Sequence, residues 1–70
     1  MRYAIIIEQG PKSFGAYVPD LPGCVAAAET REETVALIRE AIELHLEDLK
    51  SRGEPPPEPT SAFEYVEVAA

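Results

Sequence analysis

The chain has 70 residues, with 13 acidic and six basic side chains and a formal net charge of −7. A domain of this length buries only about 60% of the surface of its unfolded chain, so we expect one domain with a thin core that gains stability by association. There is no Lys/Arg cluster for a phosphate backbone, and a lone cysteine excludes an internal disulfide. The acidity fits attraction to a basic partner, or solubility alone.

We expect no export signal and no membrane anchor. The apolar run in MRYAIIIEQG ends at Glu8 and is too short for a signal peptide. No segment approaches the roughly 20 apolar residues of a transmembrane helix, and a free thiol suits a reducing compartment. The prediction is a cytoplasmic protein that does not contact membranes.

Residues 2–8 and 13–18 are rich in β-branched and aromatic residues that alternate between two faces. The turn-forming stretch GPKS lies between them, which predicts an antiparallel hairpin. Gly15 within the second strand predicts a bulge or a close backbone approach. One face of the first strand carries Tyr3, Ile5 and Ile7.

The stretch PDLPGC separates the second strand from a third one, predicted at residues 24–29. Pro19 and Pro22 cannot donate ladder hydrogen bonds, and Gly23 tolerates a positive φ angle, so a rigid corner is expected. A rigid, exposed corner that carries Leu21 loses little entropy on binding and is therefore a candidate recognition element.

An amphipathic helix is predicted over residues 31–52. Thr30 is its expected N-cap, and Glu33 reaches back in a capping box that contributes about 1 kcal/mol. Gly53 suits the position just after the helix. The apolar stripe comprises Val35, Ile38, Ile42, Leu46 and Leu49.

Leu37 and Leu44 lie outside that stripe, seven residues apart. Two apolar side chains stacked on the exposed side of a helix indicate a subunit contact. The alternative is a wide apolar face on a small domain.

Residues 54–60 are proline-rich and predict a stiff, extended connector. A last strand is predicted at residues 62–68, although its alternation leaves the buried face undecided. It returns to its own sheet or adds to the edge of a neighbouring chain.

The sequence offers little for catalysis. A thiol nucleophile needs a positioned base, and His45 is the sole histidine. A buried structural cysteine at the start of a strand is the stronger interpretation of Cys24. The acidic residues form no convergent set, so we expect no metal site, no cofactor, no catalytic residue and no enzymatic activity.

The order of these elements resembles the HicB family, the antitoxin halves of HicA–HicB toxin–antitoxin pairs in bacteria and archaea. Two strands are followed by the stretch VPDLPGCVAAAET and by a helix that starts with REE. The similarity lies in residues 14–18, the PDLPGC stretch and the helix start at residues 30–33, and the later PPPEP also suits the family. It covers nearly the whole chain, which is expected to be a single HicB-like domain over residues 1–70.

The resemblance implies an α+β fold with the order β-β-β-α-β, in which one helix packs on an antiparallel sheet, similar to part of ribonuclease H without its metal-binding carboxylates. It also implies binding to a small basic HicA-like toxin that cleaves mRNA and whose active site the antitoxin covers. Many family members carry a C-terminal DNA-binding domain. Because this chain ends at Ala70, after the last predicted strand, we expect a short form that does not bind DNA directly.

The toxin is expected to contact the corner and the last strand, and a homodimer or larger assembly is also expected. The alternative function is a solitary homo-oligomeric HicB-like module without a cognate toxin, held by Leu37, Leu44 and strand edges. The predicted toxin-contacting residues are Asp20, Leu21, Pro22, Phe63 and Tyr65.

Overall fold

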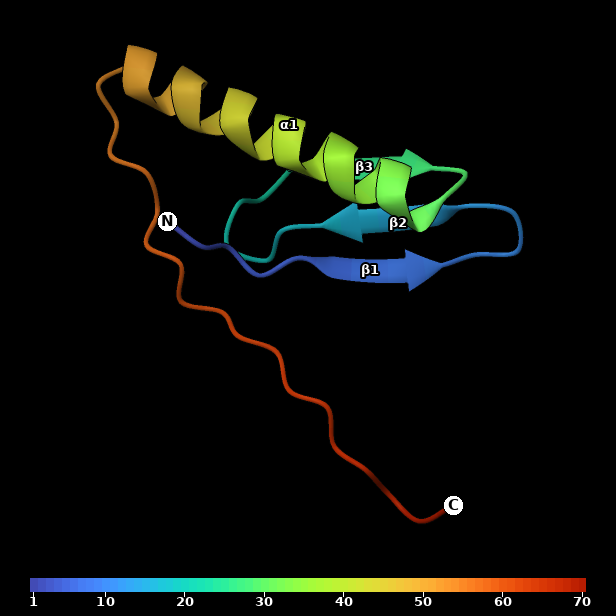
Figure 1. Cartoon of the computed structure of the whole chain (residues 1–70). Helices are drawn as coiled ribbons and strands as arrows, with labels where there is room; N and C mark the ends of the chain where they lie inside the picture. The colour runs from blue at the N-terminus through green and yellow to red at the C-terminus, as the bar shows by residue number, and fades with distance from the viewer.

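The computed structural model describes residues 1–70 and contains three strands followed by one helix (Figure 1). The strands pair antiparallel in the order β1-β2-β3, and the helix lies across one face of this sheet (Figure 1). The predicted α+β class is therefore confirmed. The elements are β1 (Ile6–Gln9), β2 (Phe14–Tyr17), β3 (Val25–Ala28) and α1 (Arg31–Ser51).

The strands are shorter than predicted because each strand residue needs a hydrogen-bonded partner on the neighbouring strand. β2 ends at Tyr17, which pairs with Ile6, so the residues before Ile6 have no strand partner. A bulge, one of the two alternatives expected at Gly15, is absent. Gly15 pairs in register with Glu8 and with Ala27, and the sheet runs through it without interruption.

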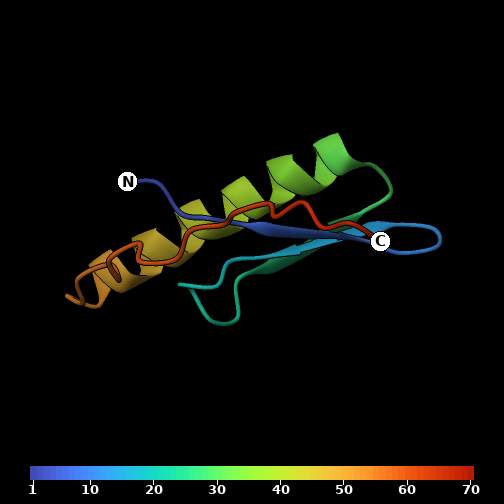
Figure 2. The same ribbon diagram turned by 90° about the horizontal axis from the view of Figure 1, so that it is seen from below.

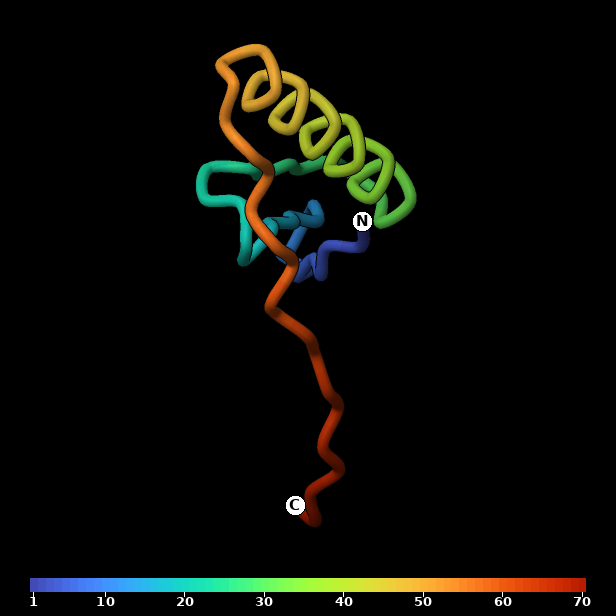
Figure 3. Tube along the Cα trace, turned by 90° about the vertical axis from the view of Figure 1, so that its left-hand side faces the viewer, coloured from blue at the N-terminus to red at the C-terminus, as the bar shows by residue number.

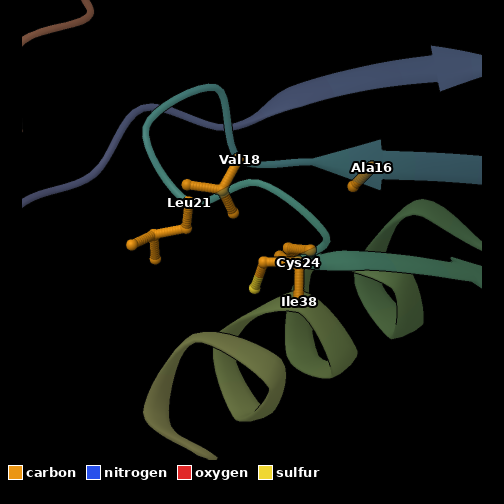
Figure 4. Packing of buried hydrophobic residues seen from close by; sticks show 5 residues of the cluster. All are labelled: Ala16, Val18, Leu21, Cys24 and Ile38. Atoms are coloured by element: carbon orange, nitrogen blue, oxygen red, sulfur yellow. The ribbon is translucent and has the colours of Figure 1, made fainter. Parts of the chain in front are cut away.

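The core lies between the sheet, the corner after β2 and the middle of α1 (Figure 4). Tyr3, Ile5 and Ile7, which the alternation places on one face of the first strand, pack together against this core. The core is as thin as the chain length suggests, because only five hydrophobic residues are buried. These are Ala16, Val18, Leu21, Cys24 and Ile38.

The helix begins as predicted. Thr30 is the N-cap, and its Oγ1 accepts a hydrogen bond from the backbone N–H of Glu33 at 3.1 Å. The same hydroxyl donates to Oε1 of Glu33 at 2.9 Å. The Glu33 carboxylate thus contacts the capping hydroxyl, whereas a standard capping box contacts the backbone N–H of the cap.

The helix ends at Ser51, one residue earlier than predicted. Gly53 adopts a φ of 73°, which a residue with a Cβ rarely does. The N–H of Gly53 donates to the carbonyl of Lys50 at 3.0 Å, and the N–H of Glu54 donates to that of Leu49 at 2.9 Å. This Schellman motif satisfies the last carbonyls of α1 and turns the chain away from the helix axis.

The strand predicted at residues 62–68 is not formed within the chain. After the helix, the connector runs back past the N-terminal segment (Figures 1 and 2). The remaining residues extend away from the sheet (Figures 1 and 3). No backbone–backbone hydrogen bond involves a residue after Glu54. A strand is defined by backbone hydrogen bonds to a neighbouring strand. This segment forms no such bonds with the sheet of its own chain.

Candidate partner-binding surface

The corner between β2 and β3 consists of two consecutive turns that share one residue. The N–H of Leu21 donates to the carbonyl of Val18, and the N–H of Cys24 donates to that of Leu21, both at 3.1 Å. The N–H of Val18 donates to the carbonyl of Cys24 at 3.2 Å and closes the corner. The predicted rigid corner is therefore built by a short, closed set of backbone bonds.

The residue types of the corner suit these turns. Pro19 and Pro22 each occupy the second position of a turn, where their fixed φ angle is favourable. Gly23 follows with a φ of 85°, as the third position of a type II turn requires. A Cβ on Gly23 would meet no atom within 4 Å, so the backbone conformation alone selects glycine there.

The prediction that Leu21 is exposed at the corner is wrong. Leu21 has an exposed fraction of 0% and is one of the core residues (Figure 4). It is the residue that both turns share, and the two turns direct its side chain inward, under the corner. Pro22 is exposed, so the surface of the corner consists of its prolines and not of its leucine.

Asp20 binds the chain segment that follows the proline-rich connector. Its carboxylate accepts hydrogen bonds from the backbone N–H groups of Thr60 and Ser61, at 3.0 and 2.9 Å. The two hydroxyl groups also donate to it, at 3.2 and 2.7 Å. The bonds from Ser61, followed by those from Thr60, hold the pKa of Asp20 below its ordinary value of 3.8.

Tyr3 provides a second attachment. Its hydroxyl donates to the carbonyl of Pro57 at 2.5 Å. Burial, followed by the nearby negative charges of Glu58 and Asp20, raises the pKa of Tyr3, so this hydroxyl keeps its proton. The connector is thus attached to the folded body at two points, which fixes where the rest of the chain leaves.

Residues 62–70, which we call the arm, carry a large exposed apolar surface. The exposed fractions of Phe63 and Tyr65 are 63% and 88%. Their rings contact each other edge to face, with centroids 5.8 Å apart and planes inclined by 77°. Both residues predicted from the sequence are accessible on the surface, as contact with a partner requires.

An open groove of about 700 Å³ lies between β1 and the start of α1. It exists because α1 packs against β2 and β3 and leaves the inner side of β1 partly uncovered. Residues 63–65 at the start of the arm also line it. The lining further includes the apolar side chains of Ile5, Ile7, Phe14 and Val35, together with Arg31.

The thiol and the acidic residues form no reactive cluster. Cys24 is buried, and this burial raises the pKa of its thiol, which disfavours the nucleophilic thiolate. Three or more His, Cys, Asp or Glu side chains gather nowhere in a geometry suited to a metal ion. The single helix is too polar to cross a lipid bilayer.

The outer face of α1 combines negative charge with two leucines. Leu37 and Leu44 have exposed fractions of 42% and 66%, so both are accessible for a subunit contact. The acidic side chains on the surface of the helix are all exposed: Glu32, Glu33, Glu40, Glu43, Glu47 and Asp48.

Sequence reasoning missed Thr60 and Ser61, which hold the arm to the corner. The available signal was weak: an aspartate within a turn, and two adjacent hydroxyl residues directly after a stiff connector. Such residues commonly bond within their own turn, so the long-range contact did not follow from them.

The structure defines a small acidic α+β domain whose open surfaces are a groove, an arm and a charged helix face. A family model described as "HicB_like antitoxin of bacterial toxin-antitoxin system" matches residues 3–69. The chain belongs to this HicB-like antitoxin family, in agreement with the resemblance of its PDLPGC stretch and helix start.

Several known proteins are similar to this chain in sequence. An uncharacterized 14.9 kDa protein of Haemophilus phage HP1 is 33% identical over 66 residues, which cover 94% of this chain and 50% of the relative. A UPF0150 protein of Helicobacter pylori is 44% identical over 46 residues, 66% of this chain and 64% of the relative. A UPF0150 protein of Archaeoglobus fulgidus is 40% identical over 52 residues, 73% of this chain and 75% of the relative.

The chain spans about half the length of the phage relative and less than two thirds of the Helicobacter one. No solved structure matches the chain significantly.

Proposed function

We propose that this protein binds and neutralises a small basic toxin of the HicA type, which cleaves mRNA, by covering its active site. The observation that carries the proposal is the match of the antitoxin family model to residues 3–69. In this proposal the protein acts in the cytoplasm by binding and is not itself an enzyme, which is supported by the buried, protonated thiol of Cys24.

Charge supports the kind of partner. The chain has a net charge of −7, and the acidic side chains of α1 are exposed. A basic toxin would be drawn to this surface, because complementary fields raise association rates. The cationic residues that an mRNA-cleaving protein uses to hold phosphates would then face the antitoxin and not RNA.

Exposed aromatic side chains supply the apolar part of the proposed contact. Phe63 and Tyr65 project from the arm, and aromatic residues are enriched among those that dominate binding energy. Pro22 adds a rigid, exposed element at the corner. Asp20 supports this surface indirectly, because its carboxylate is occupied by Thr60 and Ser61.

The test is a mild purification of the tagged protein from its native cells, followed by mass spectrometry. The proposal predicts a small basic protein in near-stoichiometric yield. The substitution Tyr65→Ala should weaken its recovery, whereas Val25→Ala, an exposed change on the opposite side of the sheet from α1, should not. Recovery of the antitoxin chain alone from cells that express the toxin gene would contradict the proposal.

The exposed leucines of α1 favour a second candidate function, a solitary homo-oligomeric module without a toxin. Such an assembly would bury Leu37 and Leu44, which are 42% and 66% exposed in the single chain. Light scattering of Leu44→Glu tests this contact: a decrease in mass supports it, and an unchanged oligomer argues against it.

A further inference from the structure

The bonds between Asp20 and the segment after the connector require a carboxylate. One of its oxygen atoms, Oδ2, accepts from the backbone N–H groups of both Thr60 and Ser61. The other, Oδ1, accepts from the two hydroxyl groups. Consecutive backbone N–H groups that converge on one oxygen form a small anion-binding site. Because all four groups donate, both atoms of the acceptor must carry lone pairs, and the nitrogen of a carboxamide does not.

Tyr3 holds the connector at a second point, closer to the helix. Its hydroxyl donates to the carbonyl of Pro57. The last backbone–backbone bond after α1 is the one made by the N–H of Glu54, so side chains alone hold the chain between the helix end and the arm. A proline-rich segment is stiff, and one that is held at two points has few conformations left.

These two contacts determine where the aromatic side chains of the arm lie. Only residue 62 separates Ser61 from Phe63, so the first ring follows the Asp20 contact directly. In this position residues 63–65 line the groove beside β1. The rings of Phe63 and Tyr65 meet edge to face there, with centroids 5.8 Å apart.

We infer that Asp20 and Tyr3 are positioning residues for partner binding: they hold the connector so that Phe63 and Tyr65 are in place before a partner arrives. This inference rests on the proposed function, in which the aromatic pair contacts the toxin. Neither positioning residue has to touch the toxin itself. A binding group that is already held in place loses less conformational entropy when its partner docks, so the affinity is higher.

The size of the effect follows from the distance along the chain to the nearest fixed residue. With Asp20 in place, Phe63 lies two residues after Ser61; without that contact it lies six residues after Pro57, and without both contacts nine residues after Glu54. The volume that a tethered group samples grows with about the 3/2 power of this number. Loss of the Asp20 contact should therefore weaken binding about fivefold, and loss of both contacts about tenfold.

The two contacts should not act independently. While Asp20 holds Ser61, the nearest fixed residue does not change when the Tyr3 contact is removed. Tyr3→Phe alone should therefore weaken binding less than about twofold, and it should weaken binding further once Asp20→Asn is present. A merely structural role for either residue would not produce this dependence of one substitution on the other.

The first measurement is a calorimetric titration of the full chain with the HicA-type toxin that co-purifies with it. The native chain is compared with Asp20→Asn, Tyr3→Phe and the double variant, for which the graded losses above are expected. Two controls match the chemical changes: Glu29→Gln removes one negative charge, and Tyr17→Phe removes the hydroxyl of an exposed tyrosine. Neither Glu29 nor Tyr17 forms a hydrogen bond with the connector, so both controls should bind as tightly as the native chain.

The second measurement uses the chain without toxin. Relaxation of the backbone ¹⁵N nuclei in NMR spectra reports motion on the picosecond to nanosecond timescale. The amides of residues 63–65 should be ordered in the native chain, more mobile in Asp20→Asn and most mobile in the double variant. The amides of α1 should not change, which separates release of the arm from loss of the fold.

Three outcomes would overturn the inference: an arm as mobile in the native chain as in the double variant, a double variant that binds the toxin as tightly as the native chain, or a Tyr3→Phe effect that is the same with and without Asp20→Asn. Failure of the proposed function looks different, because the native chain would then not bind the toxin at all. The relaxation measurement would still decide whether Asp20 and Tyr3 position the arm.

Discussion

The folded body, residues 1–54, and the C-terminal segment, residues 55–70, are held in different ways. The body is held by ladder bonds, helix bonds and a small core in which Leu21 and Ile38 are almost fully buried. The C-terminal segment is held to it by side-chain bonds from Tyr3 and Asp20. One part is therefore stabilised by itself, and the other has backbone groups and apolar side chains left for another molecule.

The largest difference between the two regions should appear on truncation of a core side chain. Leu21→Ala removes a side chain with an exposed fraction of 0% and should cost about 2–5 kcal/mol of the free energy of unfolding. Leu44→Ala, at 66% exposure, should cost less than about 0.5 kcal/mol in the monomer. Urea unfolding monitored by circular dichroism measures both. Equal costs would show that Leu21 does not support the core.

The corner should respond to a change of backbone freedom. Gly23→Ala forces a residue with a Cβ to a φ of 85° and should cost about 1–2 kcal/mol. Gly15→Ala is the control: its Cβ would lie 3.9 Å from the carbonyl oxygen of Ala26, an ordinary contact. It should be neutral or stabilise the strand by about 0.5–1 kcal/mol. A neutral Gly23→Ala would argue against the type II turn.

The start of α1 should lose stability when its cap is removed. Thr30→Ala deletes the oxygen that accepts from the N–H of Glu33 at 3.1 Å and should cost about 1 kcal/mol. Thr30→Ser keeps the hydroxyl and should stay close to the native protein. Thermal unfolding of the three proteins measures the difference, and equal midpoints for Ala and Ser would contradict the capping role.

The attachment of the arm should depend on pH. The pKa of Asp20 is lowered in the folded chain from its ordinary value of 3.8, so its bonds to Thr60 and Ser61 contribute stability above that value. The contribution decreases as the pH falls below 3.8 and is lost once the pH passes through the lowered pKa. The amide signals of Thr60 and Ser61 in NMR spectra should shift together over this acidic range.

Asp20→Asn is the matched control for this titration, because an amide of the same shape does not ionise. In this variant the two amide signals should no longer shift with pH over the same range. An Asp20 that titrates at or above its ordinary value, or an unaltered pH response in the variant, would show that the carboxylate does not hold the arm.

Much of the body could be predicted from local patterns. Alternation placed Ile5 and Ile7 on one common face because a strand has a period of two, and a threonine with a glutamate three residues later marked the helix start. These features depend on residues close in sequence. The ends of β1 could not be predicted as well, because they depend on where β2 stops.

The candidate binding surface depended on contacts that local patterns do not contain. Leu21 was expected outside because it lies between two prolines, but the shared position of two turns faces inward. The bond of Asp20 to Thr60 joins residues 40 positions apart, and its geometry follows from the path of the connector. The same path explains why residues 62–68 form no strand in a single chain.

The most direct test of the antitoxin account is a titration of RNA cleavage. A HicA-type toxin that co-purifies with this protein is freed of it, incubated with an mRNA, and supplied with increasing amounts of the native chain. The account predicts that cleavage stops near equimolar antitoxin, and that Tyr65→Ala requires more protein for the same inhibition. Undiminished cleavage in the presence of a molar excess of folded native chain would contradict it.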